Sequence, residues 1–168
     1  MRTESVVRFA GKIDRALRDE AGVPAAPVLV EAMRELAAIG SLLDDEEMIP
    51  AEDGYARHIL YADPERRFTL LSLVWLPGQF TPVHGHTAWG VVGVYAGTPT
   101  EARFSKKDDG AVQKTAYLCR PGDVTTTSVG TTEMHRIINA SADKVVTLHC
   151  YGLDLLDNPC AINIVYAQ

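Results

Sequence analysis

The stretch that decides the fold is Pro77-Gly78-Gln79-Phe80-Thr81-Pro82-Val83-His84-Gly85-His86, in which a Pro-Gly turn leads into two histidines one residue apart. In an extended strand, residues i and i+2 point to the same face of the sheet. His84 and His86 would therefore present two imidazole rings side by side, while Gly85 adds no side chain to the opposite face. Neutral imidazole is a common ligand of transition metals. The pair predicts a metal clamp; the alternative is two histidines that only hydrogen-bond with their surroundings.

Short runs rich in β-branched and aromatic residues lie on both sides of this stretch, which is typical of strands. They cover residues 56–62, 67–77, 90–97, 100–106, 113–119, 124–129, 135–139, 144–152 and 161–167. Turn signals containing Pro, Gly, Asp or Asn separate the runs. Many short strands at this spacing indicate an all-β sandwich or barrel. We therefore predict a mainly β protein, a barrel of jelly-roll type over residues 55–168.

Before the strands, apolar residues recur at intervals of three and four, which is typical of amphipathic helices. The first predicted helix covers residues 3–21, with Thr3 as its N-cap. The second covers residues 26–39, with Gly40 as its C′ residue. The acidic segment 42–55 has no periodic pattern and is predicted to be a solvated connection.

The composition is that of one ordinary globular domain, residues 1–168, with a helical cap at 1–45. The formal net charge of −6 argues against nucleic-acid binding, which needs a basic face. No apolar run reaches the roughly 18 residues of a membrane span, and the N-terminus does not resemble a signal peptide. Three cysteines without C-x-x-C spacing fit a reducing cytoplasm. The oligomeric state is left open by the sequence.

Two motifs of the chain resemble those of the cupin superfamily. The first is the stretch 77–86 followed by Gly97, and the second runs from Pro121-Gly122-Asp123 to His135. Cupins are jelly-roll barrels that hold a metal inside with histidines from both motifs, so the resemblance implies that His84, His86 and His135 are ligands. Many cupins add a glutamate shortly after the second histidine, but residues 87–90 contain no carboxylate. The resemblance therefore implies a neutral three-histidine site.

Three further residues alternate along one strand. Thr147, His149 and Tyr151 would all project to one face, where His149 could hydrogen-bond to the Tyr151 hydroxyl. The alternative is a buried Tyr-His pair that only satisfies itself. Arg57, two residues after Tyr55, offers a planar guanidinium suited to bidentate binding of a carboxylate, although an isolated arginine is more often solvated surface.

Together these residues resemble the thiol dioxygenases of the cysteine dioxygenase family, bacterial type, between Tyr55 and Tyr151. The resemblance implies Fe(II) held by the three histidines, an outer triad of Thr147, His149 and Tyr151, and a carboxylate clamp made by Arg57 with Tyr55. It also implies a small-molecule thiol substrate, cysteine first, that O₂ oxidises to a sulfinate. Thr147 replaces the usual serine. Gly90 stands where animal members carry a cysteine cross-linked to the tyrosine, so no thioether cofactor is expected.

Other functions stay open at this point. The thiol could be 3-mercaptopropionate or mercaptosuccinate, and the second carboxylate of the latter would need another cation, for which the candidates are Arg66, Arg67, Arg103 and Arg136. A non-thiol metal-dependent cupin dioxygenase, a hydrolytic zinc site and a metal-dependent sensor are further alternatives. The remaining notable residues are expected to be structural: Trp75 in the barrel core, Trp89 in the core or pocket wall, and Cys119 and Cys160 buried.

Overall fold

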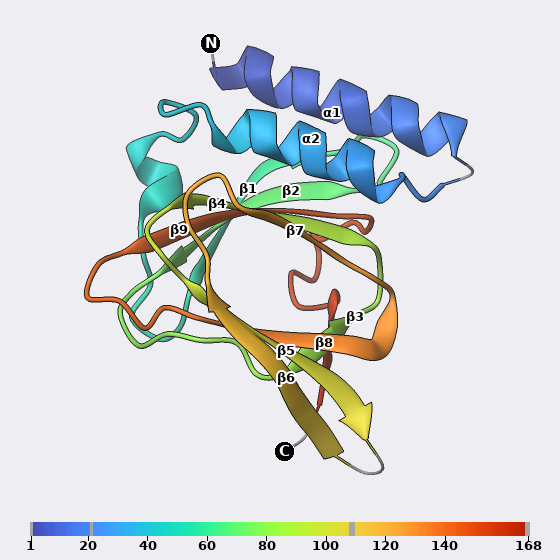
Figure 1. The fold of residues 1–168 in the computed structure, drawn as a ribbon. Helices are drawn as coiled ribbons and strands as arrows, with labels where there is room; N and C mark the ends of the chain where they lie inside the picture. Colours follow the sequence, from blue (N-terminus) through green and yellow to red (C-terminus); the bar gives the residue numbers. More distant parts are fainter. Residues whose placement is uncertain (1, 21, 108–109, 167–168) are drawn as a thin grey trace.

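The computed structural model describes residues 2–20, 22–107 and 110–166 (Figure 1). Helices α1 (Arg2–Asp19) and α2 (Ala26–Ala37) and a short 3₁₀ helix η1 (Asp45–Met48) precede the strands. The strands are β1 (Ala56–Ala62), β2 (Thr69–Trp75), β3 (His84–His86), β4 (Gly90–Ala96), β5 (Thr100–Lys107), β6 (Gly110–Leu118), β7 (Val124–Thr127), β8 (Gly130–Ile138), β9 (Val145–Tyr151) and β10 (Asn163–Val165).

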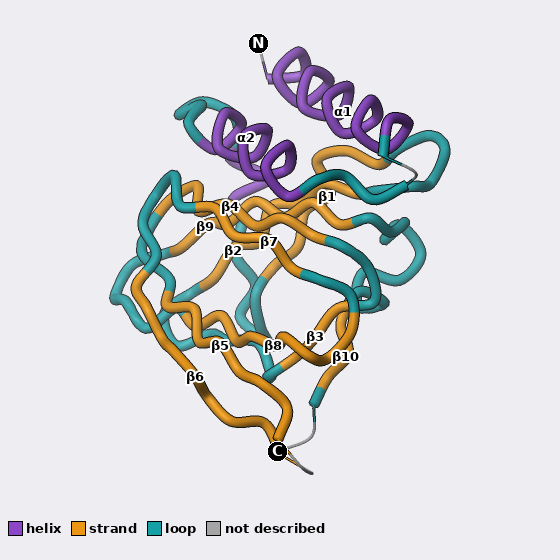
Figure 2. The backbone as a smooth tube through the Cα atoms, turned by 45° about the vertical axis from the view of Figure 1, so that its right-hand side comes forward, coloured by secondary structure: helices purple, strands orange, loops and turns teal. Residues whose placement is uncertain are grey.

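The strands form two five-stranded sheets that face each other (Figure 2). One sheet has the order β1-β2-β9-β4-β7 and the other has the order β10-β3-β8-β5-β6. All the paired strands run antiparallel, and many neighbours are distant in sequence, as in β2-β9 and β3-β8. The predicted jelly-roll barrel with N-terminal helices is confirmed.

The two helices cover the outer face of the first sheet (Figure 1). Strand side chains alternate between the two faces of a sheet, so β2 and β9 contribute to two separate apolar clusters. Leu70, Leu148 and Cys150 face outward and pack in one cluster with helix residues such as Ile13 and Met33. The inward-facing residues Leu71, Leu73, Trp75 and Val145 belong to the cluster inside the barrel. Both faces of these strands are covered, and every residue of β2 and β9 is buried.

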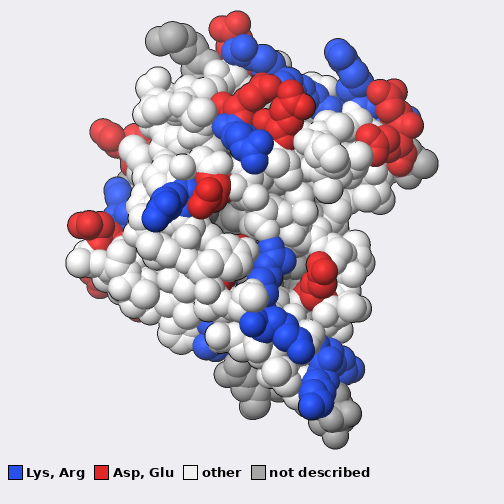
Figure 3. All heavy atoms as spheres, viewed as in Figure 1, with Lys and Arg blue, Asp and Glu red and all other residues white. Residues whose placement is uncertain are grey.

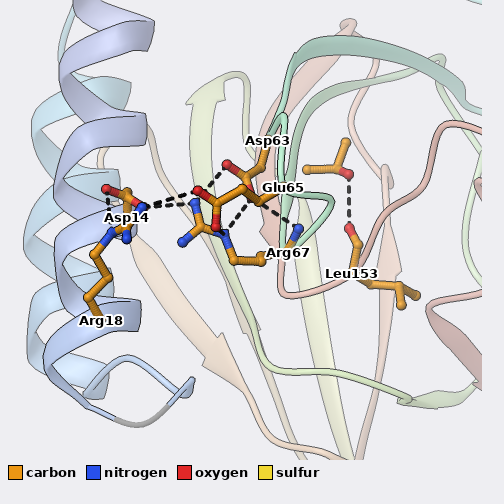
Figure 4. A network of polar contacts seen from close by, with 7 residues as sticks. Asp14, Arg18, Asp63, Glu65, Arg67 and Leu153 are labelled. Atoms are coloured by element: carbon orange, nitrogen blue, oxygen red, sulfur yellow. Dashed lines mark hydrogen bonds and ion pairs between the residues drawn. The ribbon is translucent and has the colours of Figure 1, made fainter.

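A polar network joins α1 to the turn between β1 and β2 (Figure 4). Arg67 donates from Nε to Asp63 at 2.7 Å and lies 2.7 Å from Asp14 through Nη2. Asp14 also accepts from Arg18, one helical turn further along α1. Asp63 is only 5% exposed, and the hydrogen bond from Arg67 holds its pKa below the ordinary value despite the opposing effect of burial. The network therefore fixes the helical layer to the barrel through a charge that is paired rather than solvated.

Charges of both signs gather over the helical layer, as Figure 3 shows. Lys12 of α1 and Glu35 of α2 form one such pair at 2.6 Å. Among the helices of the described chain, none combines the length and the apolar character needed to cross a bilayer.

The helix ends differ from the sequence predictions. Helix α1 already includes Thr3, so the N-cap prediction is wrong, and position 21 lies outside the described residues. Helix α2 ends with Ala38 as its C-cap rather than with Gly40 as C′. The hydroxyl of Tyr95 on β4 donates to the Gly40 carbonyl at 3.0 Å and accepts from the Leu42 amide at 3.3 Å. This tertiary contact holds the chain in a non-helical path.

The other boundary differences are small. The acidic connection contains η1, whose N-terminus has a capping box between Asp44 and Glu47. Strand β2 is shorter than the predicted 67–77, and β8 begins five residues before the predicted 135–139. The last predicted run shortens to β10, and its residue 167 lies outside the described residues.

Candidate metal centre

The structure brings His84, His86 and His135 together inside the barrel. His84 and His86 lie on β3, and His84 pairs directly with His135 of the neighbouring strand β8. The three residues are 1–3% exposed, and their potential ligand atoms all lie within 4.8 Å of one another. A Cβ at Gly85 would lie 2.1 Å from the Gly130 carbonyl oxygen, so only glycine lets β3 approach β8 this closely. The predicted grouping of the three imidazoles is therefore present.

The hydrogen bonds of the rings leave nitrogen atoms free to bind a cation. His84 Nδ1 lies 2.9 Å from the Pro82 carbonyl oxygen, and His135 Nδ1 lies 2.9 Å from Glu101 Oε1. The Nε2 atoms of His86 and His135 are buried and have no hydrogen-bond partner among the described residues. Buried nitrogens without partners are costly in a folded protein. The donor set thus fits a transition metal, which would satisfy these atoms.

The electrostatic environment keeps His84 and His86 neutral. Burial, followed by the neighbouring His135, lowers the pKa of His84 to about 4 and that of His86 to about 2. A metal ligand must offer an unprotonated nitrogen. These two rings do so at neutral pH without releasing a proton.

A buried carboxylate, which the sequence analysis missed, supports His135. Glu101 on β5 is 3% exposed and accepts hydrogen bonds from His135 Nδ1 at 2.9 Å and from the Tyr117 hydroxyl at 2.8 Å. Arg103 Nε lies 2.7 Å from the same Oε1 atom. Burial raises the pKa of Glu101, but the His135 and Arg103 contacts outweigh it and the net pKa is lowered. Within the described chain the candidate metal-binding group contains histidines alone, so this negative charge lies one hydrogen bond away from it.

On β9, Thr147, His149 and Tyr151 form the hydrogen-bonded row that the alternation predicted. Thr147 Oγ1 lies 2.8 Å from His149 Nε2, and His149 Nδ1 lies 2.8 Å from the Tyr151 hydroxyl. Burial lowers the pKa of His149 well below its ordinary value and raises that of Tyr151. The row is therefore made of neutral groups, and the Tyr151 ring lies 5.9 Å from that of His86.

Gly90 allows Tyr151 to take this position. The two residues are opposite each other on β4 and β9. A Cβ at residue 90 would lie 2.6 Å from Tyr151 Cδ1 and 2.6 Å from Thr127 Oγ1. The aromatic ring thus occupies the space that any larger side chain at this position would need.

A small cavity of about 20 Å³ connects two of the three grouped histidines with the row on β9 and with Arg57 and Tyr55. Arg57 donates from Nη2 to the Tyr55 hydroxyl at 2.6 Å, and its guanidinium carbon lies 4.4 Å from the centre of the Tyr55 ring. Arg57 is the one charged residue among those that line this cavity in the described chain. Six of the eight residues predicted from the sequence line the cavity, and the other two, His86 and Thr147, contact members of that lining. The predicted residues are therefore gathered around one small space.

The four other arginines that could have bound a second carboxylate are engaged elsewhere. Arg66 pairs with Asp154 and Asp157, and Arg67 pairs with Asp63. Arg103 pairs with Glu101, and Arg136 donates to the Thr81 carbonyl. These four are absent from the residues that line the cavity.

Trp75 lies in the barrel core and also makes polar and aromatic contacts with residues of the candidate site. It is fully buried, as predicted, but its indole Nε1 donates to Thr147 Oγ1 at 2.9 Å, and its ring stacks on Tyr55 at 4.1 Å. The sequence could have indicated this role, because the N–H group of a buried tryptophan normally finds a hydrogen-bond partner.

Cys119 is buried as expected, but the prediction for Cys160 is wrong: it lies exposed in a turn where its amide donates to the Asn158 side chain.

Comparison with known proteins identifies the architecture. No protein-family model matches the chain. A protein of Klebsiella pneumoniae described as having a double-stranded β-helix domain aligns with a TM-score of 0.53 at 14% identity, over 68% of this chain and 87% of that one. This chain has the cupin fold. The TT1209 protein of Thermus thermophilus aligns with a TM-score of 0.51 at 19% identity, over 66% of this chain and 95% of that one. At these identities the likeness concerns the barrel fold alone.

Proposed function

We propose that this protein is an Fe(II)-dependent thiol dioxygenase that converts a small monocarboxylate thiol to its sulfinate. The observation that carries the proposal is one cavity lined by two imidazoles of the three-histidine group, by one arginine, and by a tyrosine whose hydroxyl is held by a neutral histidine. These features agree with the resemblance to the cysteine dioxygenase family. In the overall reaction, R–SH + O₂ gives R–SO₂H, and both oxygen atoms are added to sulfur.

The ligand set favours an anionic substrate. Imidazole ligands bring no negative charge, so the charge of a dication stays uncompensated and a thiolate is a good further ligand. When bound, ferrous iron would supply the redox chemistry for combining the thiolate with O₂. Arg57, which lines the same cavity, can pair with the substrate carboxylate. Tyr151, positioned by His149, can donate its hydroxyl hydrogen toward the reacting atoms.

The cavity also narrows the substrate class. With a single lining cation, it binds one carboxylate better than two, which disfavours mercaptosuccinate. Arg57 favours cysteine, because relatives acting on 3-mercaptopropionate often carry Gln at that position. The second candidate is 3-mercaptopropionate, which lacks the ammonium group of cysteine. The described lining residues include no carboxylate that could pair with such an ammonium group.

The test is to load the metal-free protein with Fe(II) under anaerobic conditions and then supply O₂ with cysteine, 3-mercaptopropionate, mercaptosuccinate or cysteamine. We expect stoichiometric oxygen uptake and a mass increase of two oxygen atoms for a monocarboxylate thiol. Cysteamine, which has no carboxylate, and protein loaded with Zn(II) serve as controls. Full iron occupancy without sulfinate from any carboxylate thiol would refute the proposal and favour a non-thiol dioxygenase or a hydrolytic zinc enzyme.

A further inference from the structure

A continuous chain of hydrogen bonds begins at Trp75 and ends at the cavity. Trp75 Nε1 donates to Thr147 Oγ1 at 2.9 Å, Thr147 Oγ1 lies 2.8 Å from His149 Nε2, and His149 Nδ1 lies 2.8 Å from the Tyr151 hydroxyl. Trp75 on β2 pairs with Val145 of β9, two residues before Thr147, so its ring reaches Thr147 diagonally across the two strands. Each of the four side chains in the chain of hydrogen bonds is at most 6% exposed.

The hydrogen-bond donors and acceptors in this series of four side chains can be counted. Indole Nε1–H can only donate, whereas a threonine hydroxyl offers one donor and two acceptor sites, and a neutral imidazole offers one of each. His149 is neutral, because burial lowers its pKa well below the ordinary value. Thr147 Oγ1 must therefore accept from Trp75, and its own hydrogen needs an acceptor. Within the described part of the chain, His149 Nε2 is the one remaining partner of that hydroxyl.

We propose that Trp75 is a positioning residue that sets the direction in which hydrogen bonds are donated along this series of side chains. His149 then carries its hydrogen on Nδ1, and the Tyr151 hydroxyl hydrogen points into the cavity. His149 Nδ1–H then donates to the Tyr151 oxygen, which leaves the hydroxyl hydrogen free on the side that lines the cavity. The tautomer is inferred from the hydrogen-bond geometry together with the neutral state of His149, and it does not depend on the proposed function. Its consequence for turnover rests on the proposed function, because that function needs a donor aimed at the reacting atoms.

A specific rival arrangement exists. Thr147 also borders a second cavity of about 310 Å³, on the side of β4, β5 and β7, whose lining includes Val92, Glu101 and Thr125. If the Thr147 hydrogen pointed to a water molecule there, Thr147 would accept from both Trp75 and His149. His149 would then carry its hydrogen on Nε2, and Tyr151 would donate to Nδ1 instead of to the cavity. The two arrangements differ in the tautomer of one histidine.

The experiment is a two-bond ¹H–¹⁵N correlation spectrum of the full-length, metal-free protein labelled with ¹⁵N-histidine. We expect His149 to show a protonated Nδ1 and a bare Nε2, with its signals assigned by their loss in His149→Gln. Trp75→Phe keeps an aromatic ring against Tyr55 but removes the N–H, and we expect it to shift His149 toward the other tautomer. Trp89→Phe, the equivalent change at the second tryptophan, should leave the spectrum of His149 unchanged.

The iron-loaded protein provides the second readout. Because loss of a positioned proton donor typically costs about 10²–10⁴-fold, Trp75→Phe should lower kcat at least about tenfold while KM for the thiol changes little. A protonated Nε2 in the wild type, or an unchanged His149 tautomer in Trp75→Phe, would overturn the inference. If Trp75→Phe does not fold, Thr147→Val breaks the chain at its next member and has the same expected result. The expected tautomer in a protein that oxidises no thiol would reject the proposed function and leave the direction of the chain standing.

Discussion

Replacing Glu101 by Gln tests whether a buried negative charge strengthens metal binding through His135. Glu101 Oε1 accepts from His135 and pairs with Arg103, while Oε2 accepts a hydrogen bond from the Tyr117 hydroxyl. A glutamine whose oxygen takes the Oε1 position keeps the first two contacts, and its amide N–H₂ can donate to the Tyr117 oxygen once that hydroxyl rotates. The substitution therefore removes the charge while preserving the shape of the network.

The expected magnitude follows from this geometry. A carboxylate that accepts from the far nitrogen of a ligating histidine raises the basicity of that ligand, and its loss typically weakens metal binding about 10–100-fold. Because the glutamine in Glu101→Gln would keep a neutral hydrogen bond to His135, we expect the lower end, about tenfold or 1.4 kcal/mol. The free energy of unfolding of the metal-free protein should also fall by about 1.5–3 kcal/mol, since the partly buried Arg103 loses its ionic partner.

Two measurements separate these effects. Competition with a chromophoric chelator under anaerobic conditions gives the Fe(II) affinity, and urea unfolding of the metal-free protein gives the stability. Glu133→Gln removes the same charge from an exposed residue of β8 and should leave the metal affinity within about twofold. Equal Fe(II) affinity in the two variants would show that Glu101 stabilises the barrel without influencing the metal centre.

Four further outcomes are expected. Tyr151→Phe should retain its iron content but lose about 10²–10⁴-fold in kcat, and loss of iron would contradict the assigned role. Arg57→Ala should raise KM for carboxylate thiols about 10–100-fold without affecting the oxidation of thiols that lack a carboxylate. An unchanged KM would show that Arg57 does not bind the substrate carboxylate. Gly90→Ala should displace the Tyr151 ring, cost about 1–3 kcal/mol of stability and reduce turnover at unchanged iron content; wild-type turnover would show that the ring position is unimportant. Asp63→Asn should destabilise the protein by about 2 kcal/mol at pH 7, since it weakens a part-buried, charged hydrogen bond to Arg67. The pKa of Asp63 is lowered in the folded state, so its contribution is present above the unfolded pKa of about 3.9 and is lost as the pH falls through the folded value. Urea unfolding at pH 7 and at pH 3 checks this, and an equal difference at both pH values would refute it.

The sequence predicted those parts of the site that depend on periodicity within a strand. His84 and His86, like His149 and Tyr151, are two residues apart on one strand, and alternation alone places each pair on one face. Arg57 and Tyr55 required the family resemblance in addition, because nothing local distinguishes them from solvated side chains. These assignments needed no knowledge of which strands are neighbours.

Glu101 and Trp75 escaped prediction because their roles depend on the register between strands. Arg103 pairs with His135, so Glu101 reaches that ring only as a diagonal neighbour across β5 and β8. Trp75 reaches Thr147 in the same way across β2 and β9. Pairing between strands so far apart in sequence leaves no periodic trace. A buried charge requires partners, but no pattern in the sequence marks Glu101 as buried, since Arg103 follows it on the same face of the strand.

The helical layer bears on the site although it lies outside the barrel. The three residues of β9 that alternate with the row members, Val146, Leu148 and Cys150, are at most 1% exposed and pack in the same cluster as α1 and α2. A shift of β9 along or away from its neighbours would therefore disturb helix packing on one face and the row of Thr147, His149 and Tyr151 on the other. Because packed interiors tolerate little change in volume, the helices limit how far this row can move relative to the histidines on β3 and β8. Substitutions that create a cavity under the helices are thus expected to alter turnover by shifting β9, although the substituted residues do not contact the candidate metal centre.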